Sequence, residues 1–326
     1  MSSIKQTILN ITKATNAEEI EHIQTLWSGY GNISRYALTG SNLNTVIVKN
    51  IIYPNQTNHP RGWNTAVSHQ RKVKSYQVET EWYKSFSDLC NDDCRIPKCY
   101  GTENIGEEQV IVLEDLDAAG FPVRKSDLTK DEVKICLKWL ANFHATFLNI
   151  KPEGLWGSGT YWHLATRPDE FATMNDTPLK QVASEIDEIL SNSKFQTLVH
   201  GDAKVANFCF SEDMLNVAAV DFQYVGGGCG MKDVAYLLGS CLTENECEVY
   251  ESELLDFYFL ELKSALNIKG IESISNKLEQ EWRALYSIAW ADFTRFLMGW
   301  MPTHQKLNAY SKLMVEKALN SIKKEQ

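Results

Sequence analysis

The sequence lacks any uninterrupted apolar run of the length that a transmembrane helix needs, about 18 residues or more. Its most apolar late segment, residues 285–301, is interrupted by Asp292 and Arg295. The first residues, MSSIKQTILNITK, also lack the continuous apolar core and small-residue cleavage site of a secretory signal. We therefore expect neither a membrane span nor a secretory signal.

Paired cysteine motifs are also missing. The 8 cysteines are scattered without a C-x-x-C pair, and Cys90 and Cys94 have no second pair of ligands for a structural zinc. Reduced thiols are typical of cytosolic proteins, so we expect a cytoplasmic protein.

Basic residues are not in surplus. The chain carries 32 Lys and Arg against 42 Asp and Glu, which gives a net charge of −10. A general nucleic-acid-binding protein needs the opposite balance, so nucleic acid is not an expected partner. The acidity weakly favours a cationic substrate such as an amino alcohol, although solubility is the more common reason for it. Repeats, heptads and low-complexity tracts are absent, and 326 residues favour one unit with two lobes.

The strongest functional pattern lies between Thr197 and Gln223. Two apolar runs rich in β-branched residues flank a short polar turn, which predicts a hairpin. This hairpin would present Asp202, Asn207 and Asp221 from one compact unit. Phosphoryl transfer from a magnesium nucleotide needs a carboxylate beside the attacking hydroxyl and hard oxygen ligands for the metal. We therefore expect Asp202 to be catalytic, and Asn207 and Asp221 to bind Mg²⁺.

The same residues carry a family resemblance. His200-Gly201-Asp202 followed by Asn207 resembles the H-G-D-x-x-x-x-N loop of aminoglycoside phosphotransferases and choline-kinase-like enzymes, and Asp221-Phe222-Gln223 resembles their metal-binding D-x-[DQ]. Within that superfamily the chain is most similar to the ecdysteroid kinase-like group. The chain departs from the H-R-D and D-F-G motifs of protein kinases. Gly201 stands where those motifs have Arg, and Gln223 stands where they have Gly. The resemblance implies a small-molecule kinase that uses ATP and Mg²⁺. An ordinary β-hairpin with an Asp turn is the alternative.

The N-terminal part has the pattern of the small lobe of such a kinase. Residues up to Thr25 suggest a short helix and a first strand, and Thr15 to Glu19 has an N-cap-like signature. Gly29 and Gly31 lie in a turn that leads into a strand, where glycines would let backbone N–H groups approach phosphates. A plain hairpin turn explains these two glycines equally well.

Lys49 lies inside a β-branched strand, and Val46-Ile47-Val48-Lys49 resembles the V-A-I-K strand whose lysine contacts the nucleotide phosphates. A lysine beside an apolar layer needs a partner, which we expect from a helix over residues 67–89. Glu79 and Glu81 are the candidates, and the family's pattern of a Glu before an aromatic pair selects Glu79. A surface lysine on an edge strand is the alternative for Lys49.

Two further strands are predicted over residues 95–100 and 109–116. The resemblance makes the second one the hinge, where main-chain groups from Glu114 to Leu116 would pair with adenine. Regular structure breaks at residues 117–122, so we place the lobe boundary there. The N-terminal nucleotide-binding lobe is then residues 1–116, and the helical lobe with the catalytic hairpin and acceptor pocket is residues 117–326.

The second part is mostly helical in pattern. Thr129 opens a capping box before an apolar stripe that includes His144, which we interpret as a core histidine. Asp233 resembles the family's Asp that opens the next helix and steadies the catalytic loop, although a simple N-cap is equally consistent. Tyr161 and Trp162 are expected in the core, with the acceptor pocket as the alternative. Further helices are predicted at 179–191, 246–266, 275–300 and 307–323.

Two patterns leave alternatives open. The glycines of Val225 to Gly230 suggest a dinucleotide-binding turn, but Met231 stands where a third glycine is needed, so we interpret them as a short flexible segment. An aromatic stripe at helix spacing is usually core, yet some of its rings would suit the wall of an acceptor pocket. Its members are Trp282, Tyr286, Trp290, Phe293 and Trp300.

The sequence thus predicts an α+β, protein-kinase-like fold of two lobes: a small antiparallel sheet with a helix, and a mainly helical lobe. The predicted function is transfer of the γ-phosphoryl group of ATP, with Mg²⁺, to a hydroxyl of a small molecule. The resemblance suggests a steroid-like or other apolar alcohol, and the net charge suggests an amino alcohol. A catalytically inactive kinase fold that binds a ligand or acts as a scaffold is the second hypothesis, and an NAD-dependent oxidoreductase is the third.

Overall fold

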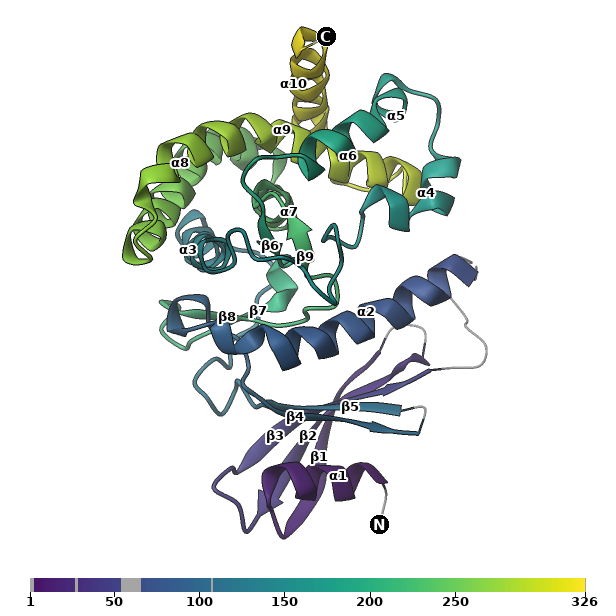
Figure 1. Ribbon diagram of the computed structural model, residues 1–326, viewed down its shortest axis with the longest axis vertical. Coiled ribbons are helices and arrows are strands. Elements are labelled where there is room, and N and C mark those ends of the chain that lie inside the picture. Colours follow the sequence, from purple (N-terminus) through teal and green to yellow (C-terminus); the bar gives the residue numbers. More distant parts are fainter. Residues whose placement is uncertain (1–2, 27–28, 54–65, 107, 326) are drawn as a thin grey trace.

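The computed structural model describes residues 3–26, 29–53, 66–106 and 108–325. A five-stranded antiparallel sheet with helices α1 and α2 forms one part, and a mainly helical part follows it in the chain (Figure 1). This confirms the predicted α+β architecture. The lobe boundary at residues 116/117 stays a prediction. The turn-rich sequence His59–Asn64, which predicts a loop, lies outside the described residues.

The sheet has the order β1-β2-β3-β5-β4. Every neighbouring pair is antiparallel, and helix α1 (Ser3–Thr12) precedes the sheet. The N-cap signature at Thr15–Glu19 was misleading, because these residues enter β1 rather than a helix. The strands are β1 (Asn16–Thr25), β2 (Gly31–Thr39), β3 (Thr45–Ile52), β4 (Cys99–Ile105) and β5 (Glu108–Glu114).

The two faces of the sheet pack differently, as the period of two in a strand requires. Val46 and Val48 of β3 join Val110 and Val112 of β5 in a small core that also contains Ile8 of α1. The alternate residues of both strands face the other way, toward the large core that the helical part shares. Lys49 belongs to this second set, which brings its side chain to the side of α2.

Helix α2 (Ala66–Ser85) lies between the sheet and the helical part (Figure 1). The predicted helix extended to residue 89, but its last residues form a separate 3-10 turn, Ser87–Leu89. Trp82 is fully buried and stacks on Phe222 of the predicted metal-binding segment, with ring centroids 4.6 Å apart. The helix therefore connects both parts of the molecule through one packed core.

The helical part follows the predicted pattern closely. The Thr129 capping box is present: its side chain accepts from the Glu132 N–H, and Glu132 accepts from the Thr129 N–H. The predicted helix over 179–191 is divided at Val182 into two helices. The helices are α3 (Lys130–Thr146), α4 (Pro168–Thr173), α5 (Pro178–Gln181), α6 (Ala183–Ser191), α7 (Met231–Cys241), α8 (Glu244–Ile268), α9 (Ser275–Trp300) and α10 (Ala309–Glu325).

Two small antiparallel ladders carry the predicted catalytic segment. The hairpin appears as β7 (Phe208–Phe210) paired with β8 (Val217–Ala219). The preceding run, β6 (Thr197–Val199), pairs instead with β9 (Gly226–Gly228). The interpretation of these glycines as a flexible segment was therefore wrong.

The close packing of β9 explains its composition. A Cβ atom on Gly226 would lie 2.2 Å from the carbonyl oxygen of Trp156, and one on Gly227 would lie 2.6 Å from that of Gly157. Neither approach leaves room for a side chain. The glycines therefore serve backbone contact with residues 156–159, and the dinucleotide-turn interpretation loses its support.

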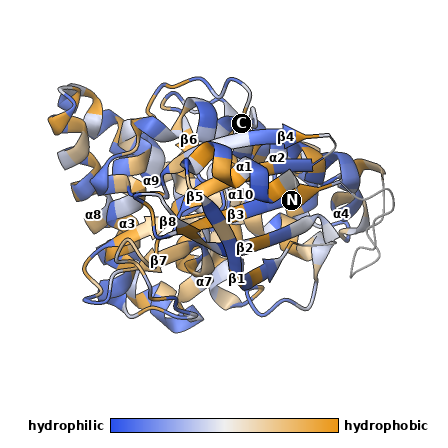
Figure 2. Ribbon diagram, turned by 90° about the horizontal axis from the view of Figure 1, so that it is seen from below, coloured by the Kyte–Doolittle hydropathy of each residue, from blue (hydrophilic) through white to orange (hydrophobic). Residues whose placement is uncertain are grey.

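Seen from below, β5 is largely hydrophobic, whereas outer helices such as α8 mix hydrophilic and hydrophobic residues (Figure 2). Within the described part of the chain, none of the helices combines the length and apolar character needed to span a membrane.

Candidate active site

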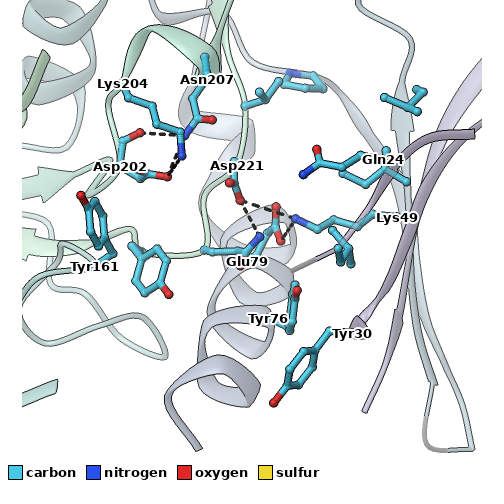
Figure 3. A pocket seen from close by; sticks show the side chains of 18 of the residues that line it. Gln24, Tyr30, Lys49, Tyr76, Glu79, Tyr161, Asp202, Lys204, Asn207 and Asp221 are labelled. Atoms are coloured by element: carbon cyan, nitrogen blue, oxygen red, sulfur yellow. Dashed lines mark hydrogen bonds and ion pairs between the residues drawn. The ribbon is translucent and has the colours of Figure 1, made fainter. Parts of the chain in front are cut away.

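A cleft of about 830 Å³ lies between the sheet, α2 and the helical part, and Figure 3 shows part of its lining. Most of the residues that the sequence singled out line it: Lys49, Glu79, Glu114, Leu116, Asp202, Asn207 and Asp221. Segments more than 150 residues apart in the chain thus meet at one site.

Gly29 and Gly31 are placed differently. Tyr30, which lies between them, lines the cleft, whereas neither glycine is among the described lining residues. Gly31 has a φ of +116°, and a Cβ atom there would lie 2.0 Å from the carbonyl oxygen of Asn50. The close approach of β2 to β3 therefore explains why position 31 is a glycine, without any contact to a phosphate.

Lys49 has the partner that its burial demands. Its Nζ lies 2.6 Å from Oε2 of Glu79 and 3.6 Å from Oδ1 of Asp221, and the side chains of Lys49 and Glu79 are 5% and 2% exposed (Figure 3). Burial alone would lower the pKa of Lys49, but the carboxylates of Glu79 and Asp221 outweigh it and raise the pKa. Lys49 is therefore held as a cation inside the cleft.

Asp202 lies across the cleft with one oxygen engaged and one free. Its Oδ2 accepts from Lys204 Nζ at 2.8 Å and from Asn207 Nδ2 at 3.1 Å. Its Oδ1 is buried and has no partner with hydrogen-bond geometry among the described residues, although the Tyr236 side chain lies close enough to interact with this carboxylate. Burial raises the pKa of Asp202, against the opposing effect of Lys204. A buried acceptor without a donor is costly unless a ligand supplies one, so Oδ1 is suited to accept from a substrate hydroxyl.

Asn207 and Asp221 provide a donor set suited to a hard divalent cation. The Asn207 amide nitrogen donates to the backbone carbonyl of Asp202 at 2.8 Å and to its carboxylate, which leaves the amide oxygen as the group for a ligand. Burial acts to raise the pKa of Asp221, but Lys49, Lys204 and Lys72 lower it, so this side chain is an anion.

No cluster of three or more His, Cys, Asp or Glu able to hold a metal occurs in the described ranges. A magnesium ion held mainly by nucleotide phosphates needs only one or two protein ligands, and the pair of Asn207 and Asp221 fits that requirement.

The loop that carries Asp202 is fixed by Asp233 at the start of α7. Oδ2 of Asp233 accepts from the N–H of His200 at 2.6 Å, and Oδ1 accepts from the N–H of Gly201 at 2.9 Å. His144, fully buried, contacts the same carboxylate through Nε2 at 3.2 Å. Asp233 therefore orders the loop, as expected, and His144 is a core histidine that supports it.

Gly201 must be glycine. Its φ is +78°, and a Cβ atom would lie 2.1 Å from the carbonyl oxygen of Tyr224 and 2.7 Å from the N–H nitrogen of Thr160. This packing explains why the motif departs from H-R-D, since arginine at this position would collide with two backbone segments.

One end of the cleft has apolar lining and borders residues 114–116, where the sequence predicts the hinge. The Glu114 side chain pairs with Arg95 at 2.6 Å, and the N–H of Glu114 donates to Lys98 O at 2.8 Å. The Leu116 carbonyl accepts from Phe121 N at 2.8 Å. Apolar side chains from both parts of the molecule line this end: Ile33, Ile47, Leu113, Leu116, Cys209 and Val220.

Several cleft cations were missed by the sequence reasoning. Lys72 lies on α2 seven residues before Glu79, and its Nζ donates to Gln223 Oε1 at 2.8 Å. Lys204 pairs with Asp202 as described. Two signals were available: Lys72 and Glu79 share one helix face at two-turn spacing, and Lys204 follows Asp202 by two residues. Arg71 and Arg167 also line the cleft, and their spacing in the sequence gave no indication of it.

The aromatic residues divide between core and cleft. Trp162 and Trp282 are both fully buried. The indole N–H of Trp282 donates to the carbonyl oxygen of Phe195 at 3.0 Å. The cleft wall on the side of Asp202 is formed by rings from α7, α9 and the segment before α4: Tyr161, Tyr236, Phe293, Phe296 and Trp300. The stripe on α9 is therefore core at its first half and cleft wall at its end.

A search of the curated proteins found no match. Among solved structures, the chain is similar to a microcompartment-associated aminopropanol kinase, with a TM-score of 0.50 and 13% identity over 97% of this chain and 94% of that chain. It is also similar to the amicoumacin kinase hAmiN, solved with AMP-PNP, Ca²⁺ and Ami, with a TM-score of 0.50 and 15% identity over 98% of this chain and 93% of that chain. At such identities the likeness concerns the fold.

The family model for ecdysteroid kinase-like proteins matches residues 40–153 and 161–270. These ranges cover more than half of the chain and include Lys49, Glu79 and the segment from His200 to Gln223. This protein is a member of the ecdysteroid kinase-like family, which groups kinase-like small-molecule phosphotransferases.

Proposed function

We propose that this protein transfers the γ-phosphoryl group of ATP, bound with Mg²⁺, to a hydroxyl group of a small molecule. The observation that carries the proposal is the buried, unpartnered Oδ1 of Asp202 in the same cleft as the Lys49–Glu79 pair, Asn207 and Asp221. Phosphoryl transfer depends mainly on positioning and charge neutralisation, which these groups supply.

The phosphate end is built from cations and oxygen ligands. Lys49, held by Glu79, pairs with the phosphates, and Asn207 and Asp221 hold the magnesium ion. The ion, when bound, neutralises charge that develops on the phosphate oxygens. The turn that contains Gly29 and Gly31 closes over the phosphates, where Tyr30 already lines the cleft.

The base end uses main-chain recognition at Glu114 to Leu116. The Glu114 N–H and the Leu116 carbonyl already have partners, so the Leu116 N–H is the donor that we assign to adenine. Apolar side chains above and below would enclose the ring.

Asp202 positions the acceptor. Its Oδ1 accepts the hydroxyl hydrogen, which aims the hydroxyl oxygen at the γ-phosphorus, and the raised pKa makes it a better proton acceptor than an exposed aspartate. Lys204, which holds the other oxygen, keeps the carboxylate oriented and adds positive charge beside the transferred group.

The expected test has two steps. A thermal-shift titration with ATP, GTP and NADH, each with and without Mg²⁺, should show a magnesium-dependent stabilisation by ATP, of about 2.7 kcal/mol at one hundred times the Kd. A shift with NADH alone would instead support an oxidoreductase. A shift with ATP but no turnover on any alcohol would support an inactive kinase fold.

The second step is Asp202→Asn. It removes a general base, so turnover should fall by about 10²- to 10⁴-fold while ATP still binds. Asp131→Asn, the same change at a side chain that is 88% exposed, is the matched control and should leave turnover unchanged. Normal turnover in Asp202→Asn would show that the assignment is wrong.

A further inference from the structure

The acceptor side of the cleft carries two buried arginines. Arg71 of α2 donates to the carbonyl oxygen of Thr166 at 2.7 Å, and Arg167 donates to the backbone carbonyl of Tyr161. Both residues are 9% exposed, and both line the cleft. Each guanidinium is thus fixed in place by backbone carbonyls.

The two guanidinium groups share one buried carboxylate. Glu170 Oε1 lies 2.9 Å from Arg167 and 3.8 Å from Arg71. Burial lowers the pKa of Arg71, and the charge of Arg167 lowers it further. Because guanidinium groups stay protonated in proteins, two positive charges face the buried carboxylate of Glu170, and the charge of Asp169 also acts on Arg71. Among the described residues that line the cleft are both arginines but neither of these carboxylates, so an anionic ligand in the cleft would meet the guanidinium groups directly.

These arginines are separate from the phosphate end. Arg71 precedes Glu79 by eight residues on α2, which corresponds to about 12 Å along the helix axis. Glu79 holds Lys49, and the nearer cation on the helix is Lys72. The positive charges of Arg71 and Arg167 in the cleft wall therefore lie toward the acceptor and away from the Lys49 end of the site.

The aromatic wall is also unsuited to a cation. Aromatic rings attract ammonium groups to their faces, but here cationic side chains of the protein already lie over the ring faces. The Arg167 guanidinium carbon lies 5.2 Å from the centroid of the Phe296 ring and 5.7 Å from that of Tyr161. Lys306 Nζ lies 5.4 Å from the centroid of Tyr236 and 5.7 Å from that of Phe293. An amine acceptor would meet positive charge at this wall.

We propose that the acceptor is an alcohol with an apolar ring and a carboxylate, and that Arg167 and Arg71 bind the carboxylate while the hydroxyl lies at Asp202. The inference rests on the proposed function, since it concerns the acceptor of the same reaction. Arginine suits this role because its planar fork matches a carboxylate. The negative net charge of the chain, which suggested a cationic acceptor, does not describe the local charge of this wall.

The test uses a set of ring alcohols of similar size whose second substituent is a negative carboxylate, a neutral carboxamide or a positive amine. We would measure calorimetric binding of 3-(hydroxymethyl)benzoate, 3-(hydroxymethyl)benzamide and 3-(aminomethyl)benzyl alcohol, and of their naphthalene analogues, to full-length protein saturated with AMP-PNP and Mg²⁺. The carboxylate should bind about tenfold or more tightly than the carboxamide, which corresponds to one charge-assisted interaction, and the amine should bind most weakly.

Variants separate recognition from a structural role. Arg167→Gln should remove the preference for carboxylate over carboxamide, whereas Arg167→Lys should keep part of it. Glu170→Gln removes the competing carboxylate and should tighten binding of the benzoate. Arg124→Gln, the same charge change at a partly exposed cleft residue, is the control and should leave the preference unchanged. A merely structural Arg167 would weaken all three ligands by the same factor.

The outcomes distinguish the inference from the proposed function. If AMP-PNP binds with Mg²⁺ but the amine binds as tightly as the carboxylate, or both carboxylates fail to bind, the inference is wrong and the kinase proposal stands. Equal losses for all ligands in Arg167→Gln would also overturn it. If AMP-PNP itself does not bind, the proposed function fails first.

Discussion

At the scale of single residues, Asp202 is subject to two opposing influences. Burial raises its pKa, and the Lys204 ammonium at 2.8 Å lowers it. A carboxylate acts as a base only when it is deprotonated, so the rate falls as the pH drops through its pKa. The acid limb of the kcat profile should therefore lie above the pKa of an ordinary aspartate, about 3.9.

Lys204→Gln tests this coupling. Removing the cation takes away the influence that lowers the Asp202 pKa, so the acid limb of kcat should move to higher pH. The readout is the position of the limb, because Lys204 also lies in the cleft and its loss lowers the rate at every pH. Arg124→Gln serves as the control for a general change of charge in the cleft. An unmoved limb in Lys204→Gln would show that Asp202 is not the titrating base.

Single residues were the most predictable level of the site. Lys49 was marked by its place inside a β-branched strand, and a buried ammonium needs a carboxylate as its partner. The choice of Glu79 over Glu81 came from the family resemblance. Arg167 could not be found in this way, since nothing in the residues around it marks them as facing a cleft. Its role depends on the path of the chain between α3 and α4, which no local pattern determines.

At the scale of elements, the loop between β6 and the 3-10 turn Val205–Asn207 depends on backbone conformation. Gly201 combines a φ of +78° with a close approach to Tyr224 O. Gly270 has a similar φ of +74°, but a Cβ atom there would meet no heavy atom within 4 Å. Alanine substitutions at these two glycines therefore separate the cost of the left-handed backbone conformation from the cost of a steric collision at the Cβ atom.

Gly201→Ala should destabilise the protein more than Gly270→Ala. A left-handed conformation alone costs an alanine about 1–2 kcal/mol, which is the whole effect expected at Gly270. At Gly201 the collision adds to it, so the free energy of unfolding should fall further and turnover should drop as Asp202 moves. Urea unfolding of both variants measures the difference. Equal losses would mean that the loop shifts freely to admit a side chain.

The elements themselves were predicted to different degrees. Helix α9 was predicted with the bounds that the structure gives, because a long aromatic and apolar stripe at helix spacing is a local signal. The pairing of β6 with β9 was missed, because β9 consists of glycines and has no alternating pattern to recognise. Its glycines are explained only by the neighbouring backbone at residues 156–159, which the fold brings there.

At the scale of the whole molecule, α2 joins the sheet to the helical part. On one side Glu79 pairs with Lys49 of β3, and on the other Trp82 stacks on Phe222 and Arg71 bonds to Thr166. A nucleotide bound between the parts would therefore lie beside Lys49 and the segment of Phe222, both of which contact this helix. The Lys49–Glu79 ion pair is a buried contact in that connection. Its contribution to the stability of the fold can be measured separately from its contribution to nucleotide binding.

Lys49→Met leaves the Glu79 carboxylate buried without its closest cation, which should lower the free energy of unfolding by about 3–5 kcal/mol. The double variant Lys49→Met/Glu79→Leu removes both charges, so most of that loss should be recovered, since apolar replacement of a buried pair is often neutral or stabilising. Neither variant should bind AMP-PNP with the wild-type affinity, because the cation that we propose to pair with the phosphates is absent from both. Urea unfolding and calorimetry measure the two properties. A double variant that regained nucleotide affinity would show that Lys49 serves the fold alone. A double variant as unstable as Lys49→Met would show that the ion pair is needed for the fold as well as for binding.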